Sequence, residues 1–188
     1  GMFSGCSSLE SIELPSSVLQ IQYSAFENCT ELKKVNFAEG IESIQSHAFR
    51  NCGKLKMLNF PESLKEVNLS AFAGCTGLTS LIFPAELKRV FNSYETERLN
   101  SIRHIIFKGQ VKKIESNCFS GNDASLKSIM FLRDAENIAA YAGIPRNTTI
   151  YGYADTNVEA YAKRCKIKFV DLSQHEHDRE NTVIIKEP

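Results

Sequence analysis

The chain has 188 residues, of which 43% are hydrophobic, so it can bury a substantial core as one continuous domain. Lysine plus arginine and aspartate plus glutamate number 22 each, and this balance provides no field that would attract nucleic acid or an anionic membrane. Because no run of residues approaches the length of a membrane-spanning helix, neither membrane insertion nor nucleic-acid binding is expected.

The first part of the chain repeats a hydrophobic pattern every 23 residues. Each copy contains a phenylalanine, a cysteine three residues later, and apolar residues three, six and eight positions after the cysteine. The first four copies contain Phe3 and Cys6, Phe26 and Cys29, Phe49 and Cys52, and Phe72 and Cys75. This period predicts a solenoid, because one copy cannot bury its apolar residues alone and stacked copies must share a core.

Each copy is expected to contribute two short strands. The last four residues of an L-x-x-I-x-L stretch predict the first strand, and a second apolar segment, such as 41–45 or 64–68, predicts another on the opposite side of the coil. The phenylalanines are expected to fill the space between these two parallel rows. The outward residues of the first row are Ser11 and Glu13, Lys34 and Asn36, Met57 and Asn59, Ser80 and Ile82, His104 and Ile106, and Ser128 and Met130.

The repetition becomes less regular but continues to about residue 132. A fifth copy contains Ile102 and a sixth contains Leu126. Between the fourth and fifth copies, residues 91–98 depart from the pattern where no structural requirement is evident. Phe91 and Tyr94 in this segment are therefore candidates for contact with a partner.

Beyond residue 132 the pattern predicts two helices, each followed by a strand. Asp134 is placed to begin a helix over 135–142, and Thr156 with Glu159 forms a capping box for a helix from 157 to about 164. The two following strands are expected near 149–151 and 167–170.

The whole array is expected to form one solenoid over residues 1–172. It contains repeats over 1–132 and modified cap repeats over 133–172, followed by a polar C-terminal tail over 173–188. The first repeat lacks the polar outer face that a terminal repeat needs for solubility. We therefore expect that the natural chain continues beyond this end, or that a partner or a second copy of the chain covers it.

The pattern L-x-x-I-x-L-P…I-x-x-x-A-F-x-x-C resembles the BspA-type leucine-rich repeats, also called the Treponema pallidum type, over roughly residues 2–172. The resemblance implies an α/β solenoid of about six units with parallel β rows and a helix-containing C-terminal cap. It also implies a secreted or surface-displayed bacterial protein that adheres to host proteins or to other cells. Because this scaffold carries many different binding surfaces, the resemblance specifies the fold better than the function.

The six cysteines indicate buried thiols that act as small hydrophobic groups. Repeats in register place the cysteines in a column at roughly the 4.8 Å strand spacing, whereas zinc needs four converging ligands and a disulfide needs closer β carbons. His175 and His177 alternate with acidic residues in the tail, where such ligands more often bind nothing in particular. We expect neither a metal nor a cofactor.

No phosphate-binding, dinucleotide-binding, zinc-protease or serine-hydrolase motif is present in the sequence. His47 occupies a position that serine fills in the neighbouring copies, and it is expected at the surface. His104 is expected on the exposed sheet face, with no nucleophile recognisable beside it. We therefore expect that the protein is not an enzyme.

The outward residues of the first row change from polar to apolar along the chain, which predicts an exposed apolar surface in the C-terminal half. A row of side chains on a rigid sheet suits a protein or extended peptide, here a host extracellular-matrix or serum protein. The alternatives are a structural spacer within a longer surface protein, or an apolar surface covered by the tail, the helices or self-association. The predicted binding residues are Met57, Ile82, His104, Ile106 and Met130, a basic border of Lys33, Lys56, Arg103 and Lys127, and the separate pair Phe91 and Tyr94.

Overall fold

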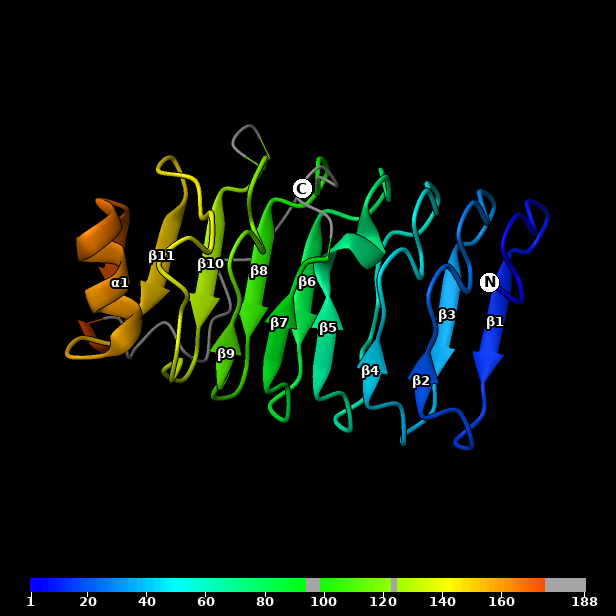
Figure 1. Ribbon diagram of the computed structural model, residues 1–188, viewed down its shortest axis with the longest axis horizontal. Coiled ribbons are helices and arrows are strands. Elements are labelled where there is room, and N and C mark those ends of the chain that lie inside the picture. The colour runs from blue at the N-terminus through cyan, green and yellow to red at the C-terminus, as the bar shows by residue number, and fades with distance from the viewer. Residues whose placement is uncertain (94–98, 123–124, 175–188) are drawn as a thin grey trace.

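The computed structural model describes residues 1–93, 99–122 and 125–174. The chain forms an elongated coil whose turns stack along the long axis of the molecule, with the first turn at one end and a helix at the other (Figure 1). Parallel strands form a row on each of two sides of the coil. The predicted solenoid of leucine-rich-repeat type is confirmed.

The first row of strands divides into two hydrogen-bonded sheets. One sheet contains two strands, and the other has five strands in the order β12-β11-β10-β8-β6. All neighbours are parallel, and equivalent positions of successive repeats face each other. The strands are β1 (Ser11–Leu14), β3 (Lys34–Phe37), β6 (Ser80–Phe83), β8 (His104–Phe107), β10 (Ser128–Phe131), β11 (Thr149–Gly152) and β12 (Lys168–Asp171).

The third repeat does not form the strand that the pattern predicts at residues 57–60. Phe60 nevertheless lies between Phe37 and Phe83, with ring centroids separated by 5.9 and 5.2 Å. Apolar packing therefore keeps this repeat in place where the backbone does not continue the sheet. The expectation of one first-row strand in every repeat is wrong at this position.

The second row is one sheet of five short parallel strands in the order β2-β4-β5-β7-β9. A short 3-10 helix, η1 (Leu69–Phe72), follows β5. The predicted second row is confirmed. Its strands are β2 (Gln20–Ile21), β4 (Ser43–Ile44), β5 (Glu66–Asn68), β7 (Arg89–Phe91) and β9 (Lys113–Ile114).

The predicted helix over 135–142 is wrong. Ala135 and Ile138 form parallel bridges with Val111 and Ile114, so this segment adds another turn to the second row. Both side chains are buried there. An isolated helix of two turns is only marginally stable, and pairing with the open edge of the sheet outweighs it.

The second predicted helix is confirmed as α1 (Asn157–Cys165), and it covers the C-terminal end of the coil (Figure 1). Thr156 Oγ1 accepts a hydrogen bond from the backbone N–H of Glu159 at 3.3 Å, as the capping box requires. The Glu159 carboxylate accepts one from the N–H of Asp155 at 3.0 Å. The helix ends at Cys165 and is capped by Lys166, whose φ of 56° is in the left-handed region.

Asp134 contributes to the start of α1 rather than to a helix of its own. Its carboxylate accepts hydrogen bonds from the backbone N–H groups of Ala135, Asn157 and Val158 at 2.9, 3.2 and 3.2 Å. We expect Asp134→Ala to lower the free energy of unfolding by about 1 to 2 kcal/mol, because it removes an acceptor and a charge from the helix N-terminus. Urea denaturation measures the loss, and Asp134→Asn, which keeps one oxygen acceptor, should lose less. An alanine variant as stable as the wild type would contradict this role.

The core contains two columns of stacked phenylalanine rings, with neighbouring centroids 5.0 to 6.2 Å apart. Contacts between Phe37 and Phe49 and between Phe60 and Phe72 join the two columns. The prediction that phenylalanines fill the space between the rows is confirmed. One column is Phe3, Phe26, Phe49 and Phe72, and the other is Phe37, Phe60, Phe83, Phe107 and Phe131.

The cysteines of the interior repeats are buried free thiols, as predicted. Each thiol also donates a hydrogen bond to a backbone carbonyl of the preceding turn, for example Cys52 Sγ to the carbonyl of Phe26 at 3.2 Å. Cys6 departs from the prediction because its turn is covered on one side only, and it is exposed. The buried thiols are Cys29, Cys52, Cys75 and Cys118, and Cys165 is partly buried.

Candidate functional site on the first row of strands

The five-stranded sheet brings apolar side chains from five repeats into one outward column. Pairing in register places Ile82, Ile106 and Met130 opposite one another on β6, β8 and β10. Tyr151 on β11 and Val170 on β12 continue the same column. The sequence reasoning missed these last two residues, although aligning the strands expected near 149–151 and 167–170 with the earlier repeats would have found them.

The members of this apolar column differ in exposure. Ile82 is 40% exposed, and Met130, Tyr151 and Val170 are partly buried. Ile106 is only 8% exposed, so the expectation that it lies on an open surface is wrong. Strand neighbours about 4.8 Å away place the apolar side chains of Ile82 and Met130 on its two sides. Replacing Ile106 would therefore disturb packing, and Ile82 and Met130 are the better probes of a binding surface.

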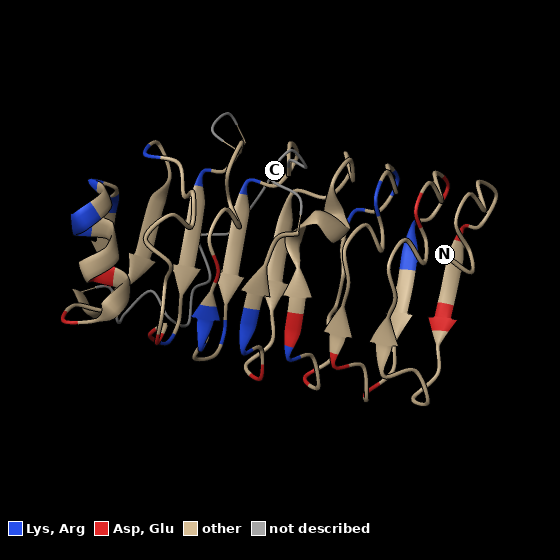
Figure 2. Cartoon of the chain, viewed as in Figure 1, with Lys and Arg blue, Asp and Glu red and all other residues tan. Residues whose placement is uncertain are grey.

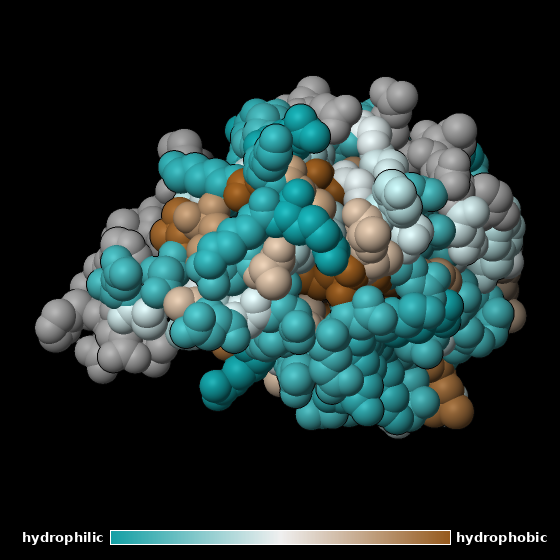
Figure 3. Space-filling model, turned by 60° about the vertical axis from the view of Figure 1, so that its left-hand side comes forward, coloured by the Kyte–Doolittle hydropathy of each residue, from teal (hydrophilic) through white to brown (hydrophobic). Residues whose placement is uncertain are grey.

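Met57 is 66% exposed but lies in the third repeat, outside the five-stranded sheet. No strand pairing connects it to Ile82 among the described residues. On the face that Figure 3 displays, hydrophobic side chains occur as small areas separated by hydrophilic ones. The predicted surface is therefore organised around the column from Ile82 to Val170, and Met57 remains a separate exposed residue.

His104 lies beside Ser128 on the next strand, with 2.8 Å between His104 Nδ1 and Ser128 Oγ. The sequence reasoning did not anticipate this contact between a potential base and a hydroxyl group. Within the described residues no carboxylate forms a hydrogen bond with the His104 ring, so the third member of a catalytic triad is absent from that part of the chain. The pair forms a polar contact between neighbouring strands. It belongs to the outward column beside the apolar one, and it makes that neighbouring column hydrophilic.

One member of the predicted basic border is paired with an acidic side chain. Lys33 Nζ lies 3.0 Å from the Glu10 carboxylate of the preceding repeat. Arg103 and Lys127 are exposed and lie directly before β8 and β10, where Figure 2 shows basic residues at the starts of the strands. Both line a groove of about 650 Å³. Lys56 is exposed at the equivalent position of the third repeat.

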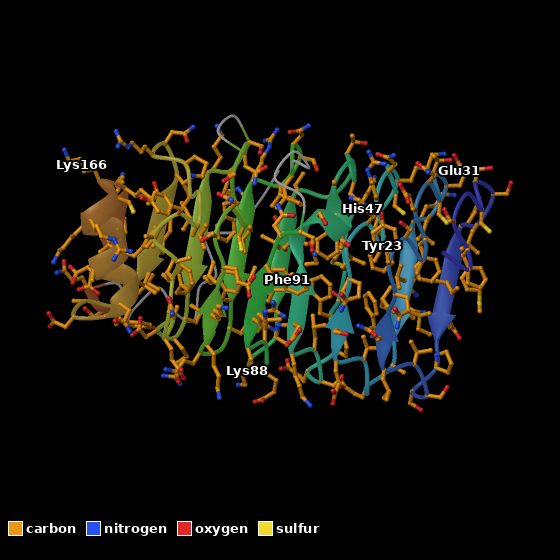
Figure 4. All side chains as sticks on the ribbon, in the orientation of Figure 1. Tyr23, Glu31, His47, Lys88, Phe91 and Lys166 are labelled. Atoms are coloured by element: carbon orange, nitrogen blue, oxygen red, sulfur yellow. The ribbon has the colours of Figure 1, made fainter. Side chains whose placement is uncertain are left out.

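Phe91 lies at the end of β7 in the second row, on the opposite side of the coil from the apolar column (Figure 4). The guanidinium group of Arg89 lies 4.4 Å from the centroid of its ring. Arg89 also pairs with Glu66 and Glu115 at 3.3 and 2.8 Å. The structure therefore does not bring Phe91 to the predicted surface, and Tyr94 lies outside the described residues.

His47 is buried, at 7% exposed, so its expected surface position is wrong. Its Nδ1 atom lies 3.1 Å from the hydroxyl oxygen of Tyr23, and the two rings meet edge to face (Figure 4). The serines at this position in neighbouring repeats, Ser24 and Ser70, are buried too. Stacked turns cover this position from both sides, so a polar residue type there does not indicate exposure.

The part of the chain that the structure describes lacks two features, a metal-binding cluster and a membrane-spanning helix. It contains no group of three or more His, Cys, Asp or Glu side chains that could hold a metal ion. It also contains no helix with the length and apolar character needed to cross a membrane. His175 and His177 lie outside this part.

Comparison with known families agrees with the repeat pattern. The profile of the BspA type leucine-rich repeat region, in six copies, matches residues 1–125 and 93–142. The chain belongs to the BspA-type leucine-rich repeat family. The resemblance seen in the sequence is thereby confirmed. Stacked repeats of this kind create an extended solenoid surface. No curated protein matches the sequence.

Solved structures show the same fold. The pneumococcal vaccine antigen PcpA is 24% identical with a TM-score of 0.74, and the match covers 87% of this BspA-type chain and 41% of PcpA. A T. pallidum leucine-rich repeat protein, TpLRR, is 23% identical with a TM-score of 0.63, and the match covers 89% of this chain and 75% of TpLRR. The chain thus spans less than half the length of PcpA. At these identities the likeness concerns the fold.

Proposed function

We propose that the chain is a non-enzymatic protein-binding module of a bacterial surface or secreted protein, which adheres to host or partner-cell proteins. The proposal rests on the in-register apolar column that begins at Ile82 and continues through Met130 to Tyr151 and Val170 on one rigid sheet. Family membership and the fold shared with PcpA, a vaccine antigen, support a surface location.

The column suits a protein or an extended peptide as its partner. Side chains from five parallel strands lie in one line, flanked by polar residues such as Ser80 and Ser128. Apolar groups within a polar border are typical of protein interfaces, where a few buried contacts provide most of the affinity. Extracellular-matrix and serum proteins are the partners that we propose to test first.

The test uses purified extracellular-matrix and serum proteins, immobilised one at a time, with the full chain in solution. For any protein that binds, we expect Ile82→Ser with Met130→Ser to weaken binding by about tenfold or more, because anchor residues commonly contribute above 1.4 kcal/mol. The melting temperature should change little, since Ile82 is exposed and Met130 is only partly buried.

The matched control is Glu13→Ser with Asn36→Ser, which changes the same column at its polar end, where the two side chains form a 3.3 Å hydrogen bond. This control should bind as the wild type does. Equal losses in the two double variants, or no loss in either, would contradict a binding role for the apolar column.

The alternative function is a structural spacer within a longer surface protein, with binding carried elsewhere. The elongated stack of turns (Figure 1) and the partial coverage of PcpA favour this alternative. Failure of the chain to bind any protein in the panel would support it. Self-association through the first turn, where Met2 is 87% exposed, stays a prediction.

A further inference from the structure

The third repeat is not hydrogen bonded into the first row of strands. In the second repeat the backbone N–H of Lys33 donates to the carbonyl of Glu10 at 2.8 Å, and in the fifth that of Arg103 donates to the carbonyl of Thr79 at 2.7 Å. Within the described chain, the backbone groups of residues 56–60 make no hydrogen bond to another backbone group. The ladder of the first row is therefore interrupted between β3 and β6.

The same repeat is bonded to both of its neighbours on the second-row side. Its strand β5 pairs with β4 of the preceding repeat and with β7 of the following one. In the loop that opens the repeat, the carbonyl of Arg50 accepts from the N–H of Asn28 at 2.8 Å, and the N–H of Asn51 donates to the carbonyl of Ala73 at 2.9 Å. Backbone hydrogen bonds thus cross the third repeat without interruption on one side of the coil only.

On the interrupted side, the contacts across the third repeat are apolar. The Phe60 ring lies between those of Phe37 and Phe83, and Leu58 is 6% exposed. Hydrophobic contacts are non-directional, so they tolerate a change of angle between turns that a hydrogen-bonded strand pair does not. Met57, at 66% exposed, points away from this packing.

We propose that the third repeat is a hinge, at which the coil opens on its first-row side and bends about the continuous second row. A solenoid depends on the interfaces between neighbouring turns, so the turn that lacks first-row hydrogen bonds is the one expected to open. The hinge separates the two-stranded sheet from the five-stranded sheet (Figure 1). Bending there changes the direction of the N-terminal turns and leaves intact the apolar column that begins at Ile82.

The experiment measures distances between pairs of spin labels by electron paramagnetic resonance in solution. The labels are attached to introduced cysteines in the full chain carrying Cys6→Ser and Cys165→Ser, because the other four native thiols are buried. Each pair spans two turns, about 10 Å between backbones in a closed stack. The test pair, Asn36→Cys with Ile82→Cys, crosses the third repeat on the first-row side.

Two matched pairs serve as controls. Ile82→Cys with Met130→Cys spans two turns inside the five-stranded sheet. Glu42→Cys with Lys88→Cys crosses the third repeat directly before β4 and β7, where the native side chains are 53% and 37% exposed. We expect the distance distribution of the test pair to be about twofold broader than those of both controls and to extend to longer distances.

A test pair as narrow as the pair within the five-stranded sheet would overturn the hinge. Equal broadening of the pair on the second-row side would also overturn it, because the whole repeat would then move and no continuous row would remain as the axis.

A second measurement needs no substitution. Lys33 and Lys56 occupy equivalent exposed positions in the second and third repeats, and trypsin cleaves after a lysine only where the backbone opens locally. Mass spectrometry of the earliest products gives the two initial rates. We expect cleavage after Lys56 to be about tenfold faster or more. Comparable rates at the two lysines would contradict preferential opening at the third repeat.

Discussion

Replacing Phe49 with alanine is expected to lower the free energy of unfolding by about 4 kcal/mol. Phe49 is fully buried in the middle of its column, where its ring stacks with Phe26 at 5.4 Å and Phe72 at 6.2 Å and meets Phe37 edge to face. The substitution leaves a cavity between turns, and a solenoid depends on the interfaces between neighbouring turns for its stability. Urea denaturation followed by circular dichroism measures the loss.

The matched control is Phe3→Ala at the open end of the same column. Phe3 stacks on Phe26 on one side only and is partly exposed, so its removal should cost clearly less. Equal effects of the two substitutions, or a loss below about 1 kcal/mol for Phe49→Ala, would show that the phenylalanine column does not hold the turns together.

Alkaline conditions are expected to destabilise the fold through its buried thiols. Burial raises the pKa of Cys75 and of Cys118 from 9.0 to about 12, and it also raises the pKa of Cys52. The stabilisation from these neutral thiols is fully present below pH 9, the value in the unfolded chain, and is lost progressively as the pH rises toward 12. At about pH 10 each thiol should cost roughly 1.4 kcal/mol, so the three together cost about 4 kcal/mol.

The measurement compares urea midpoints at about pH 8 and about pH 10 for the wild type and for Cys75→Ala. Other groups titrate in this range, so the difference between the two proteins isolates the thiol. The variant is expected to be less stable at pH 8, because it lacks the thiol and its 3.0 Å hydrogen bond to the carbonyl of Phe49, but to lose roughly 1.4 kcal/mol less on going to pH 10. An identical pH dependence of the two proteins would contradict burial of this thiol.

The outward column of the first row could be predicted from the sequence, although not all of its members could, and its role in binding stays a prediction. The alternation of outward and inward residues identified Ile82 and Met130, because neighbouring strands in register repeat the same outward position. Tyr151 and Val170 lie in the cap repeats, where the period is altered and the alignment with earlier repeats is harder to see. The burial of Ile106 depends on the side chains of adjacent strands, which a single repeat does not reveal.

The sequence by itself determined the coil, its two strand rows, the phenylalanine interior and the capped helix α1, because each depends on a period or on capping residues within a few positions. Only the tertiary structure decided that residues 135–142 join the second row and form no helix, that the first row is interrupted at the third repeat, and that His47 is buried. It also decided that Asp134 caps α1 and that Arg103 and Lys127 share a groove. These features depend on what the adjacent turn supplies, whether an open sheet edge, a covering side chain or a neighbouring charge, and that contact exists only once the turns are stacked.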